Sequence, residues 1–379
     1  MYQRKQFFLD SENYSLFFWG ARQTGKSTLL KERFPDALVF DLLLSEMYNL
    51  LLRNPEFIRQ TLLADTTKKV VIIDEIQRIP NLLNEVHWLI VNTDVRFILS
   101  GSSPRKIVRS ETNLLGGRAI RYDLFPLSYS EIPDFNLEKA LNHGLLPNHY
   151  LSKNPKKLIQ AYVGNYLRDE IVQEARIRNV AAFTDFLRIA CFSNGEMVNY
   201  SNIATDCGVA VNTIKEYFSI VEETLLGYFV RAFQKKAKRR VVLAPKFYFF
   251  DISIVNHLLN RSKIESGTEL FGNAFEQFIL MELKAHASYS GLDYSITYWR
   301  TTSGFEVDFI LNDEVAIEVK ASNNIQSRHL KGMLAFEEEF EVKKKIIVCQ
   351  ENLPRKIGNI LILPWQQFLQ QLWNNEIIS

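Results

Sequence analysis

One eight-residue segment, residues 20–27, constrains the fold of this chain more than any other feature of its sequence. It reads Gly-Ala-Arg-Gln-Thr-Gly-Lys-Ser and fits the pattern G-x-x-x-x-G-K-S. The apolar residues 16–19 before it predict a strand, and residues 27–34 after it predict a helix that ends at Pro35. A glycine-rich turn between a strand and a helix aims successive backbone N–H groups at one anion. The segment therefore predicts a phosphate-binding loop.

The side chains of this loop predict which ligand it takes. Lys26 is expected to reach the terminal phosphates of a nucleotide, and the Ser27 hydroxyl to ligate Mg²⁺. We therefore expect ATP and Mg²⁺ as the ligands; the alternative, a glycine turn without a ligand, fits the flanking strand and helix poorly. The residues expected to contact the nucleotide are Gly20, Ala21, Arg22, Gln23, Thr24, Gly25, Lys26, Ser27, Thr28 and Asp74.

A second motif, which ends in two acidic residues, completes the prediction of a hydrolase. Residues 70–75 read Val-Val-Ile-Ile-Asp-Glu, an apolar strand that ends in two acids. Asp74 is expected to hold the Mg²⁺ shell, and Glu75 to orient and deprotonate the attacking water, because hydrolysis needs a base beside the terminal phosphate. The sequence thus predicts a P-loop nucleoside-triphosphate hydrolase.

Two further polar positions belong to the same hypothesis. Ser100 follows the apolar run 95–99 and resembles the sensor element of AAA-type ATPases; a polar helix cap is the alternative. Arg118 is the candidate arginine finger, because a guanidinium can neutralise charge on the transferred phosphoryl group. Arg105 and Arg121 are its rivals.

The organisation of the chain indicates several domains. At about 150 residues per domain, 379 residues give two to three domains. Up to about residue 125, apolar runs alternate with helical stretches, which predicts an α/β fold with a doubly wound parallel sheet. The predicted domains are 1–150, a P-loop ATPase domain; 151–260, a helical domain; and 261–379, an α/β domain.

Hydropathy and charge limit the classes of partner that we expect this chain to bind. No run approaches 18 apolar residues, so we expect no membrane span and a cytoplasmic protein. The net charge is +2, but seven basic and no acidic residues lie in the stretch 231–246. Such a local excess favours contact with nucleic acid over contact with a membrane surface, which would need an amphipathic helix. A solvated loop remains the alternative.

Residues 201–218 have the spacing of a helix-turn-helix, with Ala204, Gly208 and Ile214 at its small, turn and apolar positions. Its second helix would present polar side chains to a DNA groove, and the basic stretch would form a wing. The residues expected to contact DNA are Asn212, Thr213, Lys215, Lys235, Lys236, Lys238, Arg239 and Arg240. A block that only packs between domains is the alternative.

Two alternating strands near the C-terminus bring acidic residues together. If residues 312–314 form a hairpin loop, Asp308 lies opposite Glu318, and Glu306 faces Lys320. Two opposed carboxylates repel each other, which predicts a divalent cation between them. The alternative is a salt-bridged hairpin in which Glu306 pairs with Lys320.

These elements in this order, with Leu-Phe-Pro-Leu-Ser-Tyr-Ser-Glu at 124–131 and Ala-Pro-Lys-Phe-Tyr-Phe-Phe-Asp at 244–251, resemble a bacterial and archaeal family of predicted AAA-superfamily ATPases. The resemblance spans nearly the whole chain. It implies a P-loop domain, an α-rich winged helix, and an α/β domain like PD-(D/E)XK restriction endonucleases, with Val307 in place of the signature proline.

The resemblance also implies roles in a nuclease-like site. Asp308 and Glu318 would bind Mg²⁺, Glu276 would complete the metal shell, and Lys320 would polarise the attacking water. The leading hypothesis is an ATPase that associates with DNA and whose nucleotide state gates a nuclease domain. The alternative is a nucleotide-dependent switch that binds DNA or a protein partner and has no nuclease activity. Oligomerisation stays open, because Arg118 could act within one subunit or on the next.

Overall fold

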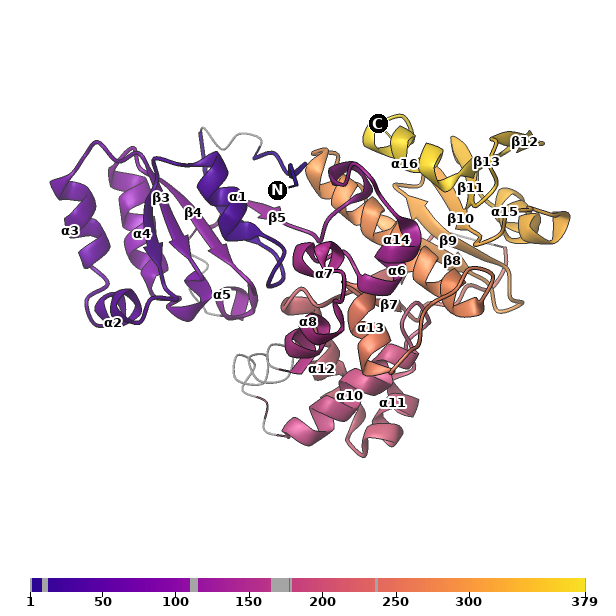
Figure 1. Cartoon of the computed structure of the whole chain (residues 1–379), viewed down its shortest axis with the longest axis horizontal. Coiled ribbons are helices and arrows are strands. Elements are labelled where there is room, and N and C mark those ends of the chain that lie inside the picture. Colours follow the sequence, from indigo (N-terminus) through magenta and orange to yellow (C-terminus); the bar gives the residue numbers. More distant parts are fainter. Residues whose placement is uncertain are drawn as a thin grey trace. The chain divides into compact units, whose positions relative to one another are not determined.

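The computed structural model describes residues 2–8, 13–109, 115–164, 177, 179–235 and 238–378 of the chain. Contacts divide the chain into two compact units (Figure 1). The N-terminal unit comprises Gln6–Phe125 and Ile220–Leu226, and the C-terminal unit comprises Met1–Lys5, Pro126–Ser219 and Gly227–Ser379. The domain boundaries at 150 and 260 stay predictions.

A five-stranded parallel sheet forms the centre of the N-terminal unit, in the order β2-β3-β4-β1-β5. The prediction of an α/β fold with a parallel sheet is confirmed. The strands are β1 (Ser15–Trp19), β2 (Leu38–Asp41), β3 (Val70–Asp74), β4 (Arg96–Gly101) and β5 (Ala119–Asp123). The helices are α1 (Lys26–Arg33), α2 (Ser45–Arg53), α3 (Phe57–Ala64), η1 (Ile76–Arg78), α4 (Leu82–Asn92) and α5 (Arg105–Arg109).

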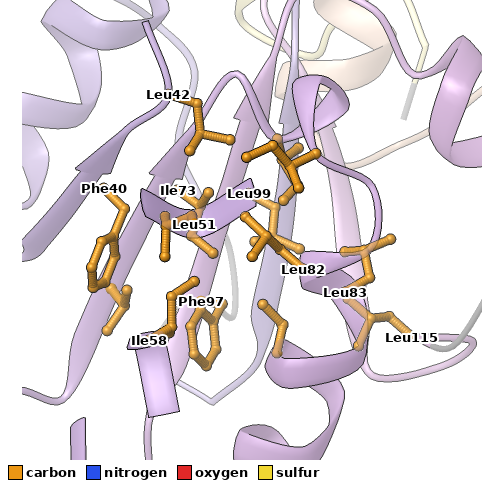
Figure 2. Packing of buried hydrophobic residues seen from close by; sticks show 14 of the residues in the cluster. Phe40, Leu42, Leu51, Ile58, Ile73, Leu82, Leu83, Phe97, Leu99 and Leu115 are labelled. Atoms are coloured by element: carbon orange, nitrogen blue, oxygen red, sulfur yellow. The ribbon is translucent and has the colours of Figure 1, made fainter. Parts of the chain in front are cut away.

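One hydrophobic core cluster of this unit lies on one face of the sheet (Figure 2). Alternate strand residues such as Ile73, Phe97 and Leu99 face helical residues such as Leu51 and Leu82. Side chains of a strand alternate between the two faces, so their neighbours in sequence point to the other side of the sheet. Burial of each such side chain contributes about 1.5–3 kcal/mol.

The position of β4 in the sheet determines which segments meet at the carboxyl ends of the strands. β4 lies between β1 and β3, and Ser100 pairs in register with both Phe18 and Asp74. The carboxyl ends of parallel strands meet at one edge, so the loop after β1 and the acids after β3 approach each other across β4.

The C-terminal unit combines helices with an eight-stranded mixed sheet in the order β12-β13-β11-β10-β9-β8-β6-β7. The helices are η2 (Tyr129–Glu131), α6 (Leu137–His143), α7 (Pro147–Leu151), α8 (Lys156–Ala161), α10 (Val180–Phe192), α11 (Tyr200–Cys207), α12 (Val211–Glu223), α13 (Ile252–Leu258), α14 (Glu269–Tyr289), η4 (Ser327–Leu330), α15 (Lys331–Glu337) and α16 (Trp365–Trp373). The last residues of α12, from Ile220 on, belong to the N-terminal unit. The strands are β6 (Gly227–Ala232), β7 (Lys246–Phe249), β8 (Ile296–Arg300), β9 (Glu306–Leu311), β10 (Val315–Val319), β11 (Lys344–Cys349), β12 (Arg355–Ile357) and β13 (Ile360–Pro364). The sheet runs through β6, which pairs with β8, so it continues across residue 260.

The turn between α11 and α12 has the local geometry that the sequence predicts. Gly208 ends α11 in the left-handed conformation with φ 64°, which glycine adopts without strain. Ala204 and Ile214 are buried on either side of it.

The hairpin of β9 and β10 has the predicted register. Ile317 pairs with Phe309, and Val315 pairs with Leu311, which leaves residues 312–314 as the connecting loop. In this register, Asp308 and Glu318 occupy neighbouring positions at one end of the hairpin.

Candidate functional site

The loop between β1 and α1 curls around the N-terminus of α1. Gln23 and Gly25 both have positive φ angles, 63° and 98°. The Thr24 hydroxyl donates to the Ala21 carbonyl at 2.8 Å and fixes the turn. A Cβ on Gly20 would lie 2.6 Å from the Leu124 carbonyl oxygen, so only glycine fits there. The predicted phosphate-binding loop therefore has the compact form that directs backbone N–H groups toward an anion.

Lys26 is the buried cation of this loop. Its ammonium donates to the Gly20 carbonyl at 2.6 Å and to the Ala21 carbonyl at 3.4 Å. Burial, followed by the nearby Arg22, lowers the pKa of Lys26, while Glu75 and Asp74 oppose this shift. A bound phosphate would add negative charge close to this ammonium and would stabilise its charged form.

Asp74 connects the loop to the neighbouring strands. One of its oxygens accepts a hydrogen bond from the Ser27 hydroxyl at 2.8 Å. The other accepts from the Ser100 hydroxyl and from the Glu75 backbone N–H at 3.1 Å. The structure thus brings together Ser27 and Asp74, the predicted metal ligands, and Ser100, the predicted sensor. A hydroxyl beside a carboxylate is a donor set that suits Mg²⁺.

Glu75 is held by two side chains that the sequence analysis did not identify. The Gln77 amide and the Ser102 hydroxyl both donate to Glu75 Oε2, the latter at 3.3 Å, and Gln77 also donates to Ser102 at 3.1 Å. Glu75 itself has φ 60°, an unusual conformation for a residue with a side chain. Ser102 follows the polar end of β4 and could have been noticed there, whereas nothing in the sequence singles out Gln77.

Gly101 makes the approach of Gln77 to Glu75 possible. A Cβ at this position would lie 2.1 Å from Gln77 Oε1 and 2.6 Å from a ring carbon of Trp19. Any larger residue would push Gln77 away from the acid.

Arg118 lies at the opposite edge of the sheet from the phosphate loop. It is exposed in the turn directly before β5, and β5 runs parallel to β1 with Ala119 opposite Ser15. Strands rise about 3.3 Å per residue, so five residues separate the two edges by roughly 16 Å. The rivals are engaged elsewhere: Arg105 pairs with Glu223, and Arg121 pairs with Asp123 at 3.0 Å.

A second polar site lies in the C-terminal unit, in a pocket of about 180 Å³ that Glu276, Glu306, Asp308, Lys246 and Lys320 help to line. Lys246 is only 4% exposed, and its ammonium lies 2.6 Å from Glu306, 3.1 Å from Glu276 and 3.9 Å from Asp308. The sequence analysis placed Lys246 in the basic stretch of a wing. Its position at the start of β7, which pairs with β6 in the sheet, brings it here instead.

Lys320 is the second ammonium of this pocket. It lies 2.5 Å from Glu318 and 3.9 Å from Asp308, and Asp308 also accepts the Val319 N–H at 2.8 Å. The hairpin register is the predicted one, but the Glu306–Lys320 ion pair of the salt-bridged alternative is not formed among the described residues. Glu306 pairs with Lys246 and, at 2.9 Å, with Arg300 on the adjacent strand β8, because these cations approach it more closely.

Burial shifts the pKa values of the acids in this pocket. It raises the pKa of Glu318 to about 8, with a further contribution from Asp308. It also raises the pKa of Glu276, against the opposing charge of Lys246. For Lys246, burial acts to lower the pKa, but Glu276, Tyr248 and Asp308 raise it well above the ordinary value.

The pocket does not form a ready metal site. Among the residues that the structure describes, no three acidic, histidine or cysteine side chains are grouped so that they could hold a metal ion. The ammonium groups of Lys246 and Lys320 lie beside the carboxylates that a divalent cation would need. One acceptor is left over, because Glu318 Oε2 is buried and has no hydrogen-bond partner in the described part of the chain.

The residues predicted to contact DNA differ in exposure and in whether they form ion pairs within the chain. Asn212 and Lys215 are exposed on α12, and Thr213 is half-buried. In the basic stretch, Lys235 pairs with Asp313 at 2.9 Å, and Arg239 pairs with Glu339 at 2.8 Å and with Glu338. Lys238 and Arg240 are exposed, and Lys236 lies outside the described residues. Part of the local positive charge is therefore offset within the chain.

The parallel sheet, the phosphate loop and the acidic end of β3 give the N-terminal unit the fold of a P-loop domain of the AAA type. Residues 12–133 match the family model of an AAA domain. Residues 134–265 match a domain of unknown function (DUF8612), and residues 271–368 match another domain of unknown function (DUF4143).

Individual relatives are distant. An uncharacterized protein of Haemophilus influenzae is 21% identical over 325 residues, which cover 77% of this chain and 78% of the relative. A solved structure of the Orc1 protein of Aeropyrum pernix in complex with DNA covers 65% of this chain and 86% of that chain, with 10% identity and a TM-score of 0.27. A score this low supports no conclusion about this chain. In the described part of the chain, no helix has the length and hydropathy needed to cross a membrane.

Proposed function

We propose that this protein binds ATP with Mg²⁺ and hydrolyses it at the phosphate loop of the N-terminal unit. The observation that carries this proposal is the hydrogen bonding of Asp74 to Ser27 on one side and to Ser100 on the other. It joins the loop after β1, the acid after β3 and the polar end of β4 in one place.

Each side chain has a distinct role in the proposed reaction. Lys26 contacts the terminal phosphates, and Ser27 and Asp74 hold Mg²⁺, which neutralises phosphate charge when bound. Glu75, fixed by Gln77 and Ser102, orients the attacking water and accepts its proton. Ser100 links Asp74 to β4, so that a structural change at the terminal phosphate can be transmitted along that strand.

The binding step is tested by calorimetric titration of MgATP into the full chain. Lys26→Ala is expected to abolish binding, because the loop loses its only buried ammonium among the described residues. Lys31→Ala is the matched control, since Lys31 is exposed farther along the same helix α1. Retained micromolar affinity in Lys26→Ala would contradict the proposal.

Arg118 is proposed to act on the nucleotide of a neighbouring subunit, since its edge of the sheet is far from the loop of its own chain. Oligomerisation is then part of the ATPase cycle. Mixing inactive Glu75→Gln and Arg118→Ala chains should restore hydrolysis, because an intact Arg118 from one chain would complete the intact Glu75 site of the other. No recovery from chains that do assemble would contradict action in trans.

Association with DNA is proposed for the segment from α11 to β7, as a winged helix. It is supported by the exposed Asn212 and Lys215 on α12 and by the exposed Lys238 and Arg240. Reversal of Lys238 and Arg240 to Glu should weaken binding of a 20-base-pair duplex and flatten its salt dependence by about two units, because each phosphate contact contributes roughly 0.9. Unchanged affinity at low salt would favour a protein partner instead.

A second candidate function, phosphodiester cleavage, is favoured by the buried Glu318 Oε2 beside Asp308 and Lys320, which has no hydrogen-bond partner among the described residues. A divalent cation would have to displace Lys246 or Lys320 before it could bind there. Plasmid cleavage with Mg²⁺ or Mn²⁺, with and without ATP, tests this directly. Cleavage by the parent but not by Lys320→Ala would support the nuclease, and no cleavage with intact ATP hydrolysis would leave a nucleotide-dependent switch.

A further inference from the structure

A third polar feature lies within the C-terminal unit, between α6, α8 and α13. α13 contacts both α6 and α8, and Figure 1 shows where the three helices lie in the chain. Residues of these helices and of the segments beside them line a pocket of about 710 Å³. Pockets for small-molecule ligands span roughly 300–1,000 Å³. All lining residues fall within residues 134–265, the part of the chain that matches the domain of unknown function DUF8612. The pocket is therefore a feature of this segment, separate from the phosphate loop and from the carboxylate pocket.

The charge of this pocket is strongly unbalanced. Four lysine or arginine side chains line it, namely Lys139, Lys156, Arg261 and Lys263, against one carboxylate, Glu138. Glu138 is already paired with Lys263. The other three cations have no carboxylate partner within the described part of the chain; Lys139 instead lies over the ring of Tyr150, at 4.6 Å. Like charges gathered in a concave surface without counter-charges favour an anionic ligand.

Two histidines that line the pocket have lowered pKa values, first because of burial and second because of the neighbouring positive charge. Burial and then the neighbouring Lys139 lower the pKa of His143. Burial and then Lys156 lower the pKa of His257. Both histidines line the pocket, so cations crowd it on the α6 side as well as on the α8 side.

Two residues that line the pocket also carry buried polar atoms without a partner in the described part of the chain. These atoms are Nδ1 of His143 and Oδ1 of Asn256. Buried polar atoms without partners cost free energy, so they are uncommon in folded proteins. The amide oxygen of Asn256 needs a donor, such as a hydroxyl or amino group, whereas the cations need an anion. A molecule that carries both kinds of group satisfies both needs.

We propose that the pocket between α6, α8 and α13 binds a small phosphorylated molecule of nucleotide size. Its phosphate groups would lie among Lys139, Lys156 and Arg261, and a hydroxyl or amino group would lie toward Asn256. The binding site is distinct from the phosphate loop, and the proposal does not depend on ATP hydrolysis there.

The test uses the full chain with Lys26→Ala, so that the phosphate loop does not compete for the probe. Inorganic pyrophosphate and adenosine 5′-monophosphate are titrated calorimetrically into this chain and into the same chain with Lys156→Ala and Arg261→Ala. The two added substitutions should weaken both probes by about tenfold or more, since each removes a charged hydrogen-bond donor. Thermal unfolding checks that the variants are folded.

The matched control replaces Lys153 and Lys157, which are exposed beside or on α8 but do not line the pocket. It removes the same amount of charge and should leave both affinities unchanged. Asn256→Ala should weaken adenosine 5′-monophosphate several-fold but pyrophosphate much less, because pyrophosphate has no ribose hydroxyl and no amino group.

Three results would overturn the proposal. One is the absence of binding for both probes at millimolar concentration, and another is an equal loss of affinity in the control. The third concerns a labelled 20-base-pair duplex and a labelled 20-nucleotide single strand. If these lose affinity in the Lys156→Ala and Arg261→Ala chain while neither small probe binds, the pocket is part of a nucleic-acid surface rather than a small-molecule site.

Discussion

The phosphate loop and the carboxylate pocket both gather charged side chains, but they differ in how the charges are neutralised. At the phosphate loop, the Lys26 ammonium donates its hydrogen bonds to backbone carbonyls within the described part of the chain, and Ser27 beside it is exposed. In the carboxylate pocket, the ammonium groups of Lys246 and Lys320 each contact carboxylates of the chain itself. The first site is arranged to receive charge from a ligand, whereas the second already contains its counter-ions. Charged residues alone therefore do not identify a ligand site; the state of their partners does.

The largest expected effect is the loss of ATP hydrolysis when Glu75 is replaced. If this loss were not observed, the contrast between the two sites would not hold. Glu75→Gln keeps the shape of the side chain but removes the base, so hydrolysis should fall by about a hundredfold or more while MgATP binding persists. Phosphate release and calorimetric affinity measured on the same preparation separate the two effects. Hydrolysis at the parent rate would mean that another group activates the water.

The next effect tests whether Lys246 is the counter-ion of the carboxylate pocket. Lys246→Met leaves Glu276, Glu306 and Asp308 near one another without this ammonium, and breaking a buried ion pair costs about 3–5 kcal/mol. Chemical unfolding measures the loss. Lys235→Met is the control, because the pair with Asp313 is half-exposed and should contribute only about 0–1 kcal/mol. Equal losses in the two variants would remove the contrast between the sites.

A smaller effect is expected from the residue that positions Glu75. Gln77→Ala removes one of the two side chains that hold the acid, so kcat should fall by about tenfold with little change in KM. Gln60→Ala, an exposed change on α3, should alter neither constant. A rise in KM at constant kcat would assign Gln77 to nucleotide binding instead.

A separate prediction is a pH dependence of stability in the C-terminal unit. Burial raises the pKa of Glu282 from its ordinary 4.5 to about 8, although Tyr129 N–H and the Trp373 indole donate to it. The folded chain then holds this proton more tightly than the unfolded chain, so Glu282 lowers stability as the pH rises between these values. Glu282→Gln cannot titrate, so its free energy of unfolding relative to the parent should increase over this range. A difference that is constant with pH would contradict the shift.

The phosphate loop could be predicted because its determinants are contiguous. Residues 20–27 form one turn, and the register of parallel strands places Asp74 beside it. The hairpin register of β9 and β10 followed from side-chain alternation and a short loop for the same reason. In both cases, local geometry carries nearly all of the information.

Contacts that depend on tertiary approach could not be predicted in the same way. Lys246 reaches Glu276 and Glu306 only because the folded unit brings together side chains from β7, α14 and β9, and the sequence shows Lys246 only as one base in a basic stretch. Gln77 reaches Glu75 because Gly101 leaves room for it. The pocket between α6, α8 and α13 likewise combines residues more than a hundred positions apart, so no local pattern marks it.

Steady-state phosphate release from MgATP by the purified chain, compared with Lys26→Ala and Lys31→Ala, tests the central claim most directly. The account predicts Mg²⁺-dependent turnover by the parent and by Lys31→Ala, and none above background by Lys26→Ala. Turnover that survives in Lys26→Ala, or a folded parent that binds MgATP yet releases no phosphate in any assembly state, would contradict the assignment of ATP hydrolysis to this loop.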